Sequence, residues 1–168
     1  MPKRAAAQRS KPEDDTRQWL IWMLKGGGAH VSFDVAVGNF PPELCGKRPG
    51  KLPFSAWQLL EHMRIAQHDI LDFCVNPEYR QLEWPDAFWP KGATPPDSSG
   101  WERSVRAFRG GIREMERLIR NPQTSLIRQI PWGSGQTITR EALLLADHNA
   151  YHLGELVLLR RLLGAWPG

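Results

Sequence analysis

The chain has 168 residues, 41% of them apolar and 24% charged, which is enough to bury one sizeable core but not two. This composition, with eight Trp residues, excludes intrinsic disorder, a collagen-like fibre and a coiled coil. The net charge of +4 comes from the first eleven residues, because removing their four basic residues leaves 18 Lys and Arg against 18 Asp and Glu. A body without net charge predicts no binding to nucleic acid.

The N-terminal segment predicts neither a membrane anchor nor an export signal. Residues 1–13 are interpreted as a flexible basic tail, and residues 14–168 as one globular domain. The apolar run at residues 19–24 is far shorter than the roughly 20 residues that a membrane span needs. Cys45 and Cys74 are not in a CxxC arrangement, so we expect reduced thiols in a cytoplasmic protein without membrane contact.

The first of four predicted helices covers about residues 15–38. It ends before Pro41 and Pro42, since proline lacks the amide hydrogen and its ring obstructs the preceding turn. Three successive glycines at residues 26–28 lie inside this segment, and each costs about 1 kcal/mol relative to Ala in a helix. The glycines therefore predict a kink or a close backbone contact.

The second and third predicted helices begin with the same type of signal. Residues 55–58 (Ser-Ala-Trp-Gln) and 99–102 (Ser-Gly-Trp-Glu) both match a capping box. The Asn-Pro pairs at residues 76–77 and 121–122 end the two helices, because the residue before proline disfavours helical dihedral angles.

The fourth predicted helix begins at Thr137 or Thr139 and ends at Gly164, a suitable left-handed C-terminal residue. Residues 77–98 form a long loop that is rich in proline and aromatic residues, as expected of a crossover connection or a lid. No segment has the alternation of a β-strand. The sequence thus predicts an all-α domain in which four helices form a bundle.

The inward faces of the third and fourth helices differ in their chemistry. The third has an apolar face without ionisable groups, formed by Trp101, Val105, Phe108, Ile112, Met115 and Ile119. The fourth interrupts its expected core stripe, Leu144, Leu145, Leu159 and Leu163, with His148 and His152. At this spacing the two Cβ atoms lie about 5–6 Å apart, so both imidazoles can reach one point.

A third histidine, His62, interrupts the inward stripe of the second helix between Leu59 and Phe73. Packing of the second helix on the fourth would bring it opposite His148 and His152. Three neutral imidazoles leave a coordination position open, as in catalytic zinc sites, and they also suit nickel, iron or manganese. The alternative is a set of core histidines that are hydrogen-bonded to neighbouring groups.

Other ionisable residues are weaker candidates. Asp69 and Glu155 each follow a candidate ligand by seven residues, so they either accept a hydrogen bond from an imidazole or face solvent. His30, with Asp34, either lines the pocket or is a hydrogen-bonded core histidine. Glu61 directly precedes His62, and its different helix face predicts a surface charge.

The fourth helix carries two further indications. Residues 149–151 between its histidines are Asn-Ala-Tyr, so the Glu that serves as base in the zinc-protease motif His-Glu-x-x-His is missing. The side opposite the histidines is small and apolar, with Ala146, Ala150, Leu153 and Val157. Such a stripe predicts packing against another helix of the chain or a twofold dimer contact, and we favour a homodimer.

The segments WQLLEHMRIAQHDI, with His62, and ADHNAYHLGELVLLRRLLG, with His148 and His152, resemble the DinB-like metal-binding superfamily. The similarity extends from about residue 16 to the C-terminus. It implies an up-down-down-up four-helix bundle, often dimeric, with a divalent metal held by these three histidines. Family members with known activity include thiol S-transferases that use bacillithiol or mycothiol, and thiol-dependent maleylpyruvate isomerases.

Three functions follow as hypotheses. The first is a metal-dependent enzyme, of the thiol S-transferase or hydrolase type, in which zinc or nickel, or else iron or manganese, activates a thiol or water towards a small-molecule substrate. Trp84, Phe88 and Trp89 would help to enclose its pocket, and no side chain stands out as a general base. The second is a non-catalytic protein that binds a metal or small molecule, and the third is a metal-free interaction module.

Overall fold

A computed structural model describes residues 12–166, and this part of the chain contains α-helices and short 3-10 helices but no strand. A single isolated bridge joins Gln129 and Thr137 among these residues. The fold is therefore all-α, as the sequence predicts, and the tail predicted for residues 1–13 falls almost wholly outside the described residues. The elements are α1 (Pro12–Lys25), α2 (Phe33–Val37), η1 (Pro42–Leu44), α3 (Ala56–Val75), η2 (Asp86–Phe88), α4 (Gly100–Arg120) and α5 (Ile138–Leu162).

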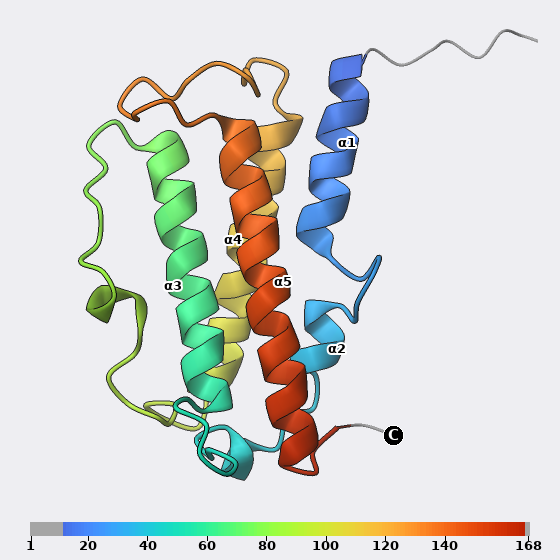
Figure 1. The fold of residues 1–168 in the computed structure, drawn as a ribbon, viewed down its shortest axis with the longest axis vertical. Helices are drawn as coiled ribbons and strands as arrows, with labels where there is room; N and C mark the ends of the chain where they lie inside the picture. The colour runs from blue at the N-terminus through green and yellow to red at the C-terminus, as the bar shows by residue number, and fades with distance from the viewer. Residues whose placement is uncertain (1–11, 167–168) are drawn as a thin grey trace, which may run out of the picture.

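The four long helices pack lengthwise on one another (Figure 1). Helix α3 contacts both α4 and α5, and α1 contacts α4 and α5 from the other side. The short helix α2 continues below α1 and packs on α5. After α3, the chain returns along the outside of the molecule to the end where α3 begins, and it carries η2 on this path. This long connection therefore runs beside α3 and contacts it through η2.

The single helix predicted for residues 15–38 is wrong, because α1 ends at Lys25 and α2 begins at Phe33. Gly26 and Gly27 have φ angles of +64° and +81°. Residues with a side chain rarely adopt this left-handed region, whereas glycine does so without steric cost. The glycines thus end the helix and turn the chain, where the sequence indicated no more than a kink.

Local hydrogen bonds explain which predicted helix starts are confirmed. The capping box of α3 is formed, since the Ser55 hydroxyl accepts from the Gln58 amide at 3.2 Å and the Gln58 side chain accepts from the Ser55 amide at 3.1 Å. Helix α4 also begins at the predicted place, but its capping box is absent. The Ser99 hydroxyl donates to Asp97 at 2.9 Å instead of capping the helix.

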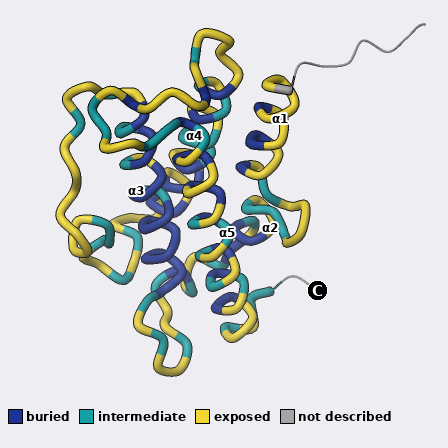
Figure 2. The backbone as a smooth tube through the Cα atoms, turned by 45° about the horizontal axis from the view of Figure 1, so that its top comes forward, coloured by how far each residue is buried: buried dark blue, intermediate teal, exposed yellow. Residues whose placement is uncertain are grey.

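The start and end of α5 agree with the sequence. The Thr137 hydroxyl accepts from the Arg140 amide at 3.2 Å, and Gly164 has a φ angle of +69°. Leu145 and Leu159 are buried in the core, whereas Leu144, which was expected in the same stripe, is 38% exposed. The inward face of α5 is therefore rotated slightly away from Leu144. Figure 2 shows this buried inner face of the helices and the exposed loops around it.

The small apolar stripe of α5 packs within the chain. Ala146 belongs to a buried cluster with residues of α1, and Leu153 to one with residues of α2. Ala150 and Val157 are partly buried beside them. Of the two occupants that the sequence left open, the structure thus places helices of the same chain on this stripe, so it offers no dimer contact.

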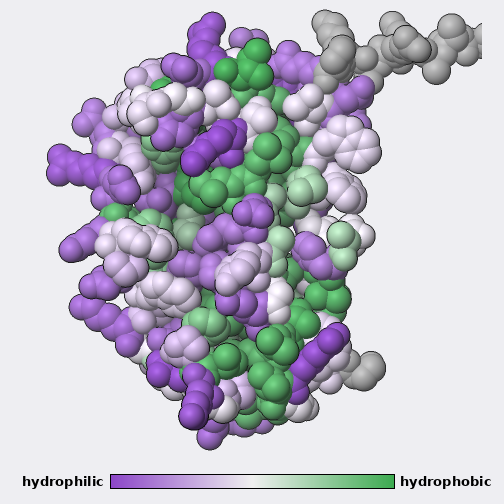
Figure 3. All heavy atoms as spheres, in the orientation of Figure 1, coloured by the Kyte–Doolittle hydropathy of each residue, from purple (hydrophilic) through white to green (hydrophobic). Residues whose placement is uncertain are grey.

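Large apolar side chains are exposed on a different face. Figure 3 shows hydrophobic residues gathered over the outward side of α5. By exposed fraction, the exposed large hydrophobic residues of α5 are Leu143, Leu144, Tyr151, Leu158 and Leu162, and those of α1 are Trp19, Trp22 and Met23. None of the described helices is long and apolar enough to cross a lipid bilayer.

Candidate metal centre

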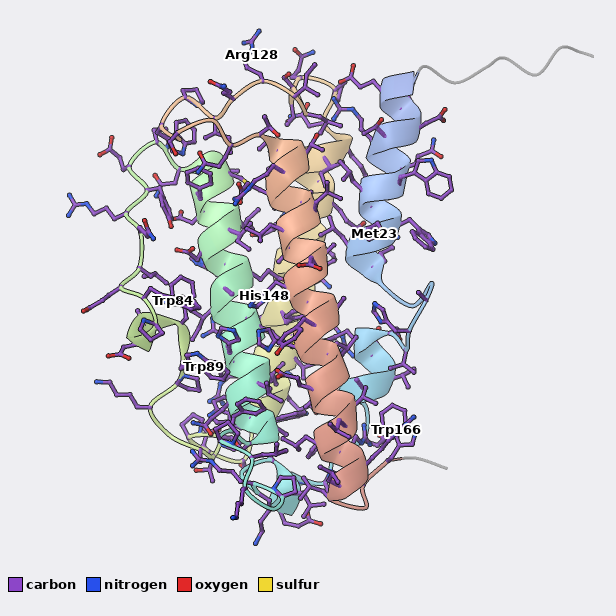
Figure 4. The ribbon with its side chains drawn as sticks, viewed as in Figure 1. Met23, Trp84, Trp89, Arg128, His148 and Trp166 are labelled. Carbon is purple, nitrogen blue, oxygen red and sulfur yellow. The ribbon has the colours of Figure 1, made fainter. Side chains whose placement is uncertain are left out.

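Helices α3 and α5 bring three histidines together at the middle of their shared interface. His62 belongs to α3, and His148 and His152 belong to successive turns of α5. Figure 4 shows His148 on α5 beside α3. The Nε2 atom of His62 lies 3.1 Å from the Nε2 atoms of both His148 and His152. One nitrogen from each ring lies within 4.8 Å of the others, so the group has the compactness of a metal site.

Hydrogen bonds on the far side of two rings determine where their protons lie. His62 Nδ1 donates to the main-chain oxygen of Phe88 at 2.9 Å, and His152 Nδ1 donates to Glu155 at 2.7 Å. Both partners only accept, so in the neutral rings each Nε2 carries a lone pair. Two lone pairs facing each other at 3.1 Å repel unless a cation lies between them. This arrangement is the one by which proteins orient histidine ligands.

The spacing also suits first-row metals. Two nitrogens that each lie about 2.0–2.1 Å from a shared ion, and 3.1 Å from each other, subtend about 100° at that ion. Both His152 and His148 keep this spacing to His62, so two of the three pairs fit a shared ion. The residues present therefore fit a divalent transition metal and leave the opposite side for another ligand.

Burial keeps the three imidazoles neutral. Removal from water lowers the pKa of His148 to about 4, with a further contribution from its histidine neighbours. The pKa of His152 is lowered to about 4 by burial and by His62, and that of His62 is lowered mainly by burial. At neutral pH all three rings are thus neutral, and each has one nitrogen with a lone pair that a metal could bind.

Aromatic side chains cover the site. The Trp89 ring is stacked on His62 with 4.0 Å between centroids and 3° between planes, and Tyr151 meets His152 edge-on at 4.9 Å. Trp89 directly follows η2, and Phe88 within η2 supplies the main-chain oxygen that holds His62. Trp84, which was expected to enclose the pocket, is 68% exposed and packs on Phe88 instead.

The remaining candidates take different places. Glu155 lies at the site, where burial raises its pKa against the opposing effect of a hydrogen bond from Tyr151. The Asp69 carboxylate accepts from the hydroxyl of Tyr79 at 3.0 Å and does not join the triad. This result follows from helix geometry, because seven residues place it about 10 Å along α3 from His62.

His30 and Asp34 do not form the predicted pair. His30 is exposed in the turn after α1, where its Nδ1 contacts the neighbouring main-chain oxygen of Val31, so it is neither a core histidine nor a part of the triad. Asp34 forms an ion pair with Arg109 at 2.7 Å. The break at the glycines moves both residues out of the helix on which the pairing was based.

The prediction that Glu61 is a surface charge is wrong, because the residue is buried and only 8% exposed. Arg64 donates two hydrogen bonds to its carboxylate, at 2.8 and 2.9 Å, and the hydroxyl of Ser104 donates a third. These donors outweigh the cost of burial and lower the pKa of Glu61. The group is thus a satisfied contact between α3 and α4.

Two groups at the site escape sequence analysis. The main-chain oxygen of Phe88 has no signature in the sequence, since every residue carries one. Asn149 follows a candidate ligand and is 8% exposed, and its buried side-chain oxygen has no hydrogen-bond partner within residues 12–166. Asn149 could have been identified from the sequence as a polar residue at an inward position of the fourth helix.

Fold and site together define an all-helical protein with a three-histidine candidate metal centre. No family model, curated protein or solved structure matches the chain.

Proposed function

We propose that the protein belongs to the DinB-like superfamily and holds a divalent transition metal with His62, His148 and His152. The observation that carries the proposal is the pair of imidazoles whose Nδ1 atoms donate to Phe88 and Glu155, which leaves facing lone pairs at 3.1 Å. The long connection between α3 and α4 supports the up-down-down-up bundle of that superfamily.

The proposed activity is that of a metal-dependent transferase or hydrolase. A divalent metal, zinc or nickel before iron or manganese, supplies Lewis acidity that lowers the pKa of a bound thiol or water. His62, His148 and His152 fix the open side of the ion, and Glu155 keeps His152 oriented. Trp89 shields the ring of His62 from water. A low-molecular-weight thiol and a small electrophile are the proposed substrates.

A non-catalytic metal-binding protein is the second candidate, and a specific contact favours it. Glu155 is the carboxylate that the described residues place against the triad, and it already accepts from His152 at 2.7 Å. A carboxylate committed in this way is a poor general base. A protein that stores or senses the metal needs no such base.

Elemental analysis of protein purified without a histidine tag tests the metal assignment. We expect close to one transition-metal ion per chain in the wild type, and a loss of the ion on His148→Ala, His62→Ala or His152→Ala. A folded wild-type protein that takes up no metal after incubation with Zn²⁺, Ni²⁺, Fe²⁺ or Mn²⁺ would contradict the assignment and favour a metal-free interaction module.

Conjugation of a small thiol to a model electrophile separates the two metal-dependent candidates. The enzyme predicts a rate that depends on added metal and falls at least 100-fold in His148→Ala. Equal rates for the wild type and the variant, with metal bound by the wild type alone, would leave the binding protein as the better account.

The homodimer remains part of the proposal, with a different surface from the one first considered. The exposed apolar residues of α1 and α5, among them Trp19 and Leu158, offer a twofold contact. Sedimentation equilibrium of the wild type and of Trp19→Glu/Leu158→Glu tests it. We expect a dimer that the two charges convert to a monomer, and a monomeric wild type would contradict it.

A further inference from the structure

A line of buried amides crosses the apolar core beside the triad. Gln67 of α3 is 1% exposed, and its Nε2 donates to the main-chain oxygen of Phe108 in α4 at 2.7 Å. Asn149 of α5 donates through Nδ2 to Oε1 of Gln67 at 3.4 Å. Because a main-chain oxygen only accepts, it fixes the orientation of Gln67, and Gln67 in turn fixes that of Asn149. The line therefore ends in the oxygen of Asn149.

Beside Asn149 in the sequence lies His148, a candidate ligand whose Nδ1 atom also lacks a hydrogen-bond partner in the described part of the chain. Asn149 Oδ1 and His148 Nδ1 are both buried, and both are without a hydrogen-bond partner among the described residues. The two residues are consecutive in α5, and interaction with the Asn149 side chain opposes the lowering of the pKa of His148 by burial. One group can accept and the other can carry a proton, so a small adjustment satisfies both.

We propose that Asn149 is a positioning residue: its Oδ1 accepts the Nδ1 proton of His148 and so directs the Nε2 lone pair of His148 at the metal. This inference rests on the proposed function, which it deepens by adding the missing support of the third ligand. His62 has Phe88 and His152 has Glu155 in the same role. The three ligands are then held by a main-chain oxygen, a carboxylate and an amide.

The opposite tautomer of His148 is the competing arrangement in the metal-free protein. With its proton on Nε2, His148 would donate to Nε2 of His62 at 3.1 Å. This choice would leave His148 Nδ1 and Asn149 Oδ1 as two buried acceptors without a donor. A hydrogen bond from His148 Nδ1 to Asn149 removes this cost. It also keeps the proton away from Nε2 of His148, where it could otherwise be donated to His62 in place of a cation.

A glycine of α4 makes room for the line. A Cβ atom at Gly111 would lie 2.2 Å from Nε2 of Gln67, a distance that forces the amide to move. A Cβ atom at the adjacent Gly110 would meet only the end of the Arg113 side chain, at 3.9 Å. The two positions therefore form a matched pair for testing the line from a helix that does not contact the metal.

The tautomer of His148 in the metal-free protein is the first measurement. Nitrogen-15 chemical shifts of the imidazole distinguish a proton on Nδ1 from one on Nε2. We expect the Nδ1 proton in the wild type and in Gly110→Ala, and a shift towards the Nε2 proton in Asn149→Leu and Gly111→Ala. An Nε2 proton in the wild type, or no change in Asn149→Leu, would overturn the proposal.

Binding of Co²⁺, followed by its visible absorption, is the second measurement. We expect an affinity 10- to 100-fold lower in Asn149→Leu, the range found for the loss of a group that orients a ligand. Asn149→Asp retains an acceptor and should recover most of the affinity. Equal affinities for all three proteins would contradict the role of Asn149.

The two measurements separate this inference from the proposed function. A wild type that binds no Co²⁺ contradicts the metal assignment. The tautomer of His148 is measured without metal, so it tests the role of Asn149 independently of that assignment. Thermal unfolding of each variant verifies that it is folded. If Asn149→Leu does not fold, Gly111→Ala with Gly110→Ala as control provides the same comparison.

Discussion

Two buried polar groups of this protein, Arg160 and the histidine triad, differ in how fully their neighbours satisfy them. Arg160 is 2% exposed, and its guanidinium donates to main-chain oxygens that surround it. Its acceptors are Ala165 at 2.7 Å, Ala36 at 2.8 Å, Asn39 at 3.2 Å and Val35 at 3.3 Å. Each contact ties α5 to the chain around α2 or to the C-terminal turn, so the group serves the architecture.

The triad shows the opposite balance. Two of its rings, His62 and His152, donate outwards to Phe88 and Glu155 and direct acceptors inwards at each other. A buried donor set that is fully matched stabilises a fold, whereas convergent acceptors without a donor indicate a ligand that completes them. The comparison teaches that the partners of a buried polar group, more than its burial, distinguish structure from function.

The largest effect is expected from removing the satisfied group. Arg160→Met leaves buried main-chain oxygens without donors and should lower the free energy of unfolding by about 4 kcal/mol, as measured in urea. Exposed Arg161→Met is the matched control and should change it by less than about 0.5 kcal/mol. The folded fraction of Arg160→Met should still bind one metal per chain. A loss of metal would show that Arg160 also supports the histidine site, which would contradict its purely structural role.

A smaller effect is expected from loosening one ligand. Glu155→Ala removes the acceptor of His152 Nδ1 and should weaken Zn²⁺ binding about 10- to 100-fold in competition with a chromophoric chelator. Asp147→Ala, an exposed carboxylate on the same helix, should bind Zn²⁺ as the wild type does. Similar weakening in both variants would point to general charge and not to orientation of the ring.

Acid should destabilise the metal-free protein through the triad. Burial lowers the pKa of His148 and His152 to about 4, from an ordinary 6.5. The unfolded chain therefore binds more protons between these pH values, and stability is lost as pH falls from 6.5 to 4. Because partial contact with solvent screens the charges, we expect a loss of about 2 kcal/mol in urea unfolding.

The pH experiment has its own control. His148→Leu/His152→Leu removes both titrating groups and should flatten the dependence within this window. A wild type whose stability is unchanged between pH 7 and pH 4.5 would show that the imidazoles are not buried as described.

The smallest effect has the opposite sign. His148→Leu abolishes metal binding but removes a buried lone pair, on Nε2, that faces another acceptor without a donor, so the metal-free protein should gain about 1 kcal/mol in free energy of unfolding. Denaturation with and without excess Zn²⁺ measures both properties, because Zn²⁺ should stabilise the wild type alone. Destabilisation of the metal-free variant would place His148 with Arg160 as a structural group.

Helix ends were predictable where a contact a few residues away determines them. Ser55 with Gln58 and Thr137 with Arg140 form the contacts that their spacing predicts. Ser99 has the same spacing to Glu102, but Asp97 takes its hydroxyl and the capping box is lost. Whether a capping box forms depends on other hydrogen-bond partners of the serine. Asp97 lies outside the four residues of the pattern, so the pattern could not predict its effect.

The ligand cluster was predictable because helix geometry alone places His148 and His152 on one face, with His62 on an inward position of α3. Of its surroundings, Glu155 follows one of the two alternatives that its spacing left open, and the other groups were not predicted. Glu61 is buried through contacts with Ser104 on another helix, and Phe88 contributes a main-chain oxygen that any residue could supply. Helical periodicity predicts which residues share one face of a helix. It does not predict which helix or loop packs on that face, and the contacts of Glu61 and Phe88 depend on that packing.

The loop that carries η2 acts on His62 at two points through adjacent residues. Phe88 holds the Nδ1 proton while Trp89 rests on the ring face. A molecule that enters by pushing Trp89 aside therefore also frees the imidazole to rotate. One loop would then control both access to the site and the rigidity of His62, so displacement of Trp89 should increase the exchange rate of a metal bound there.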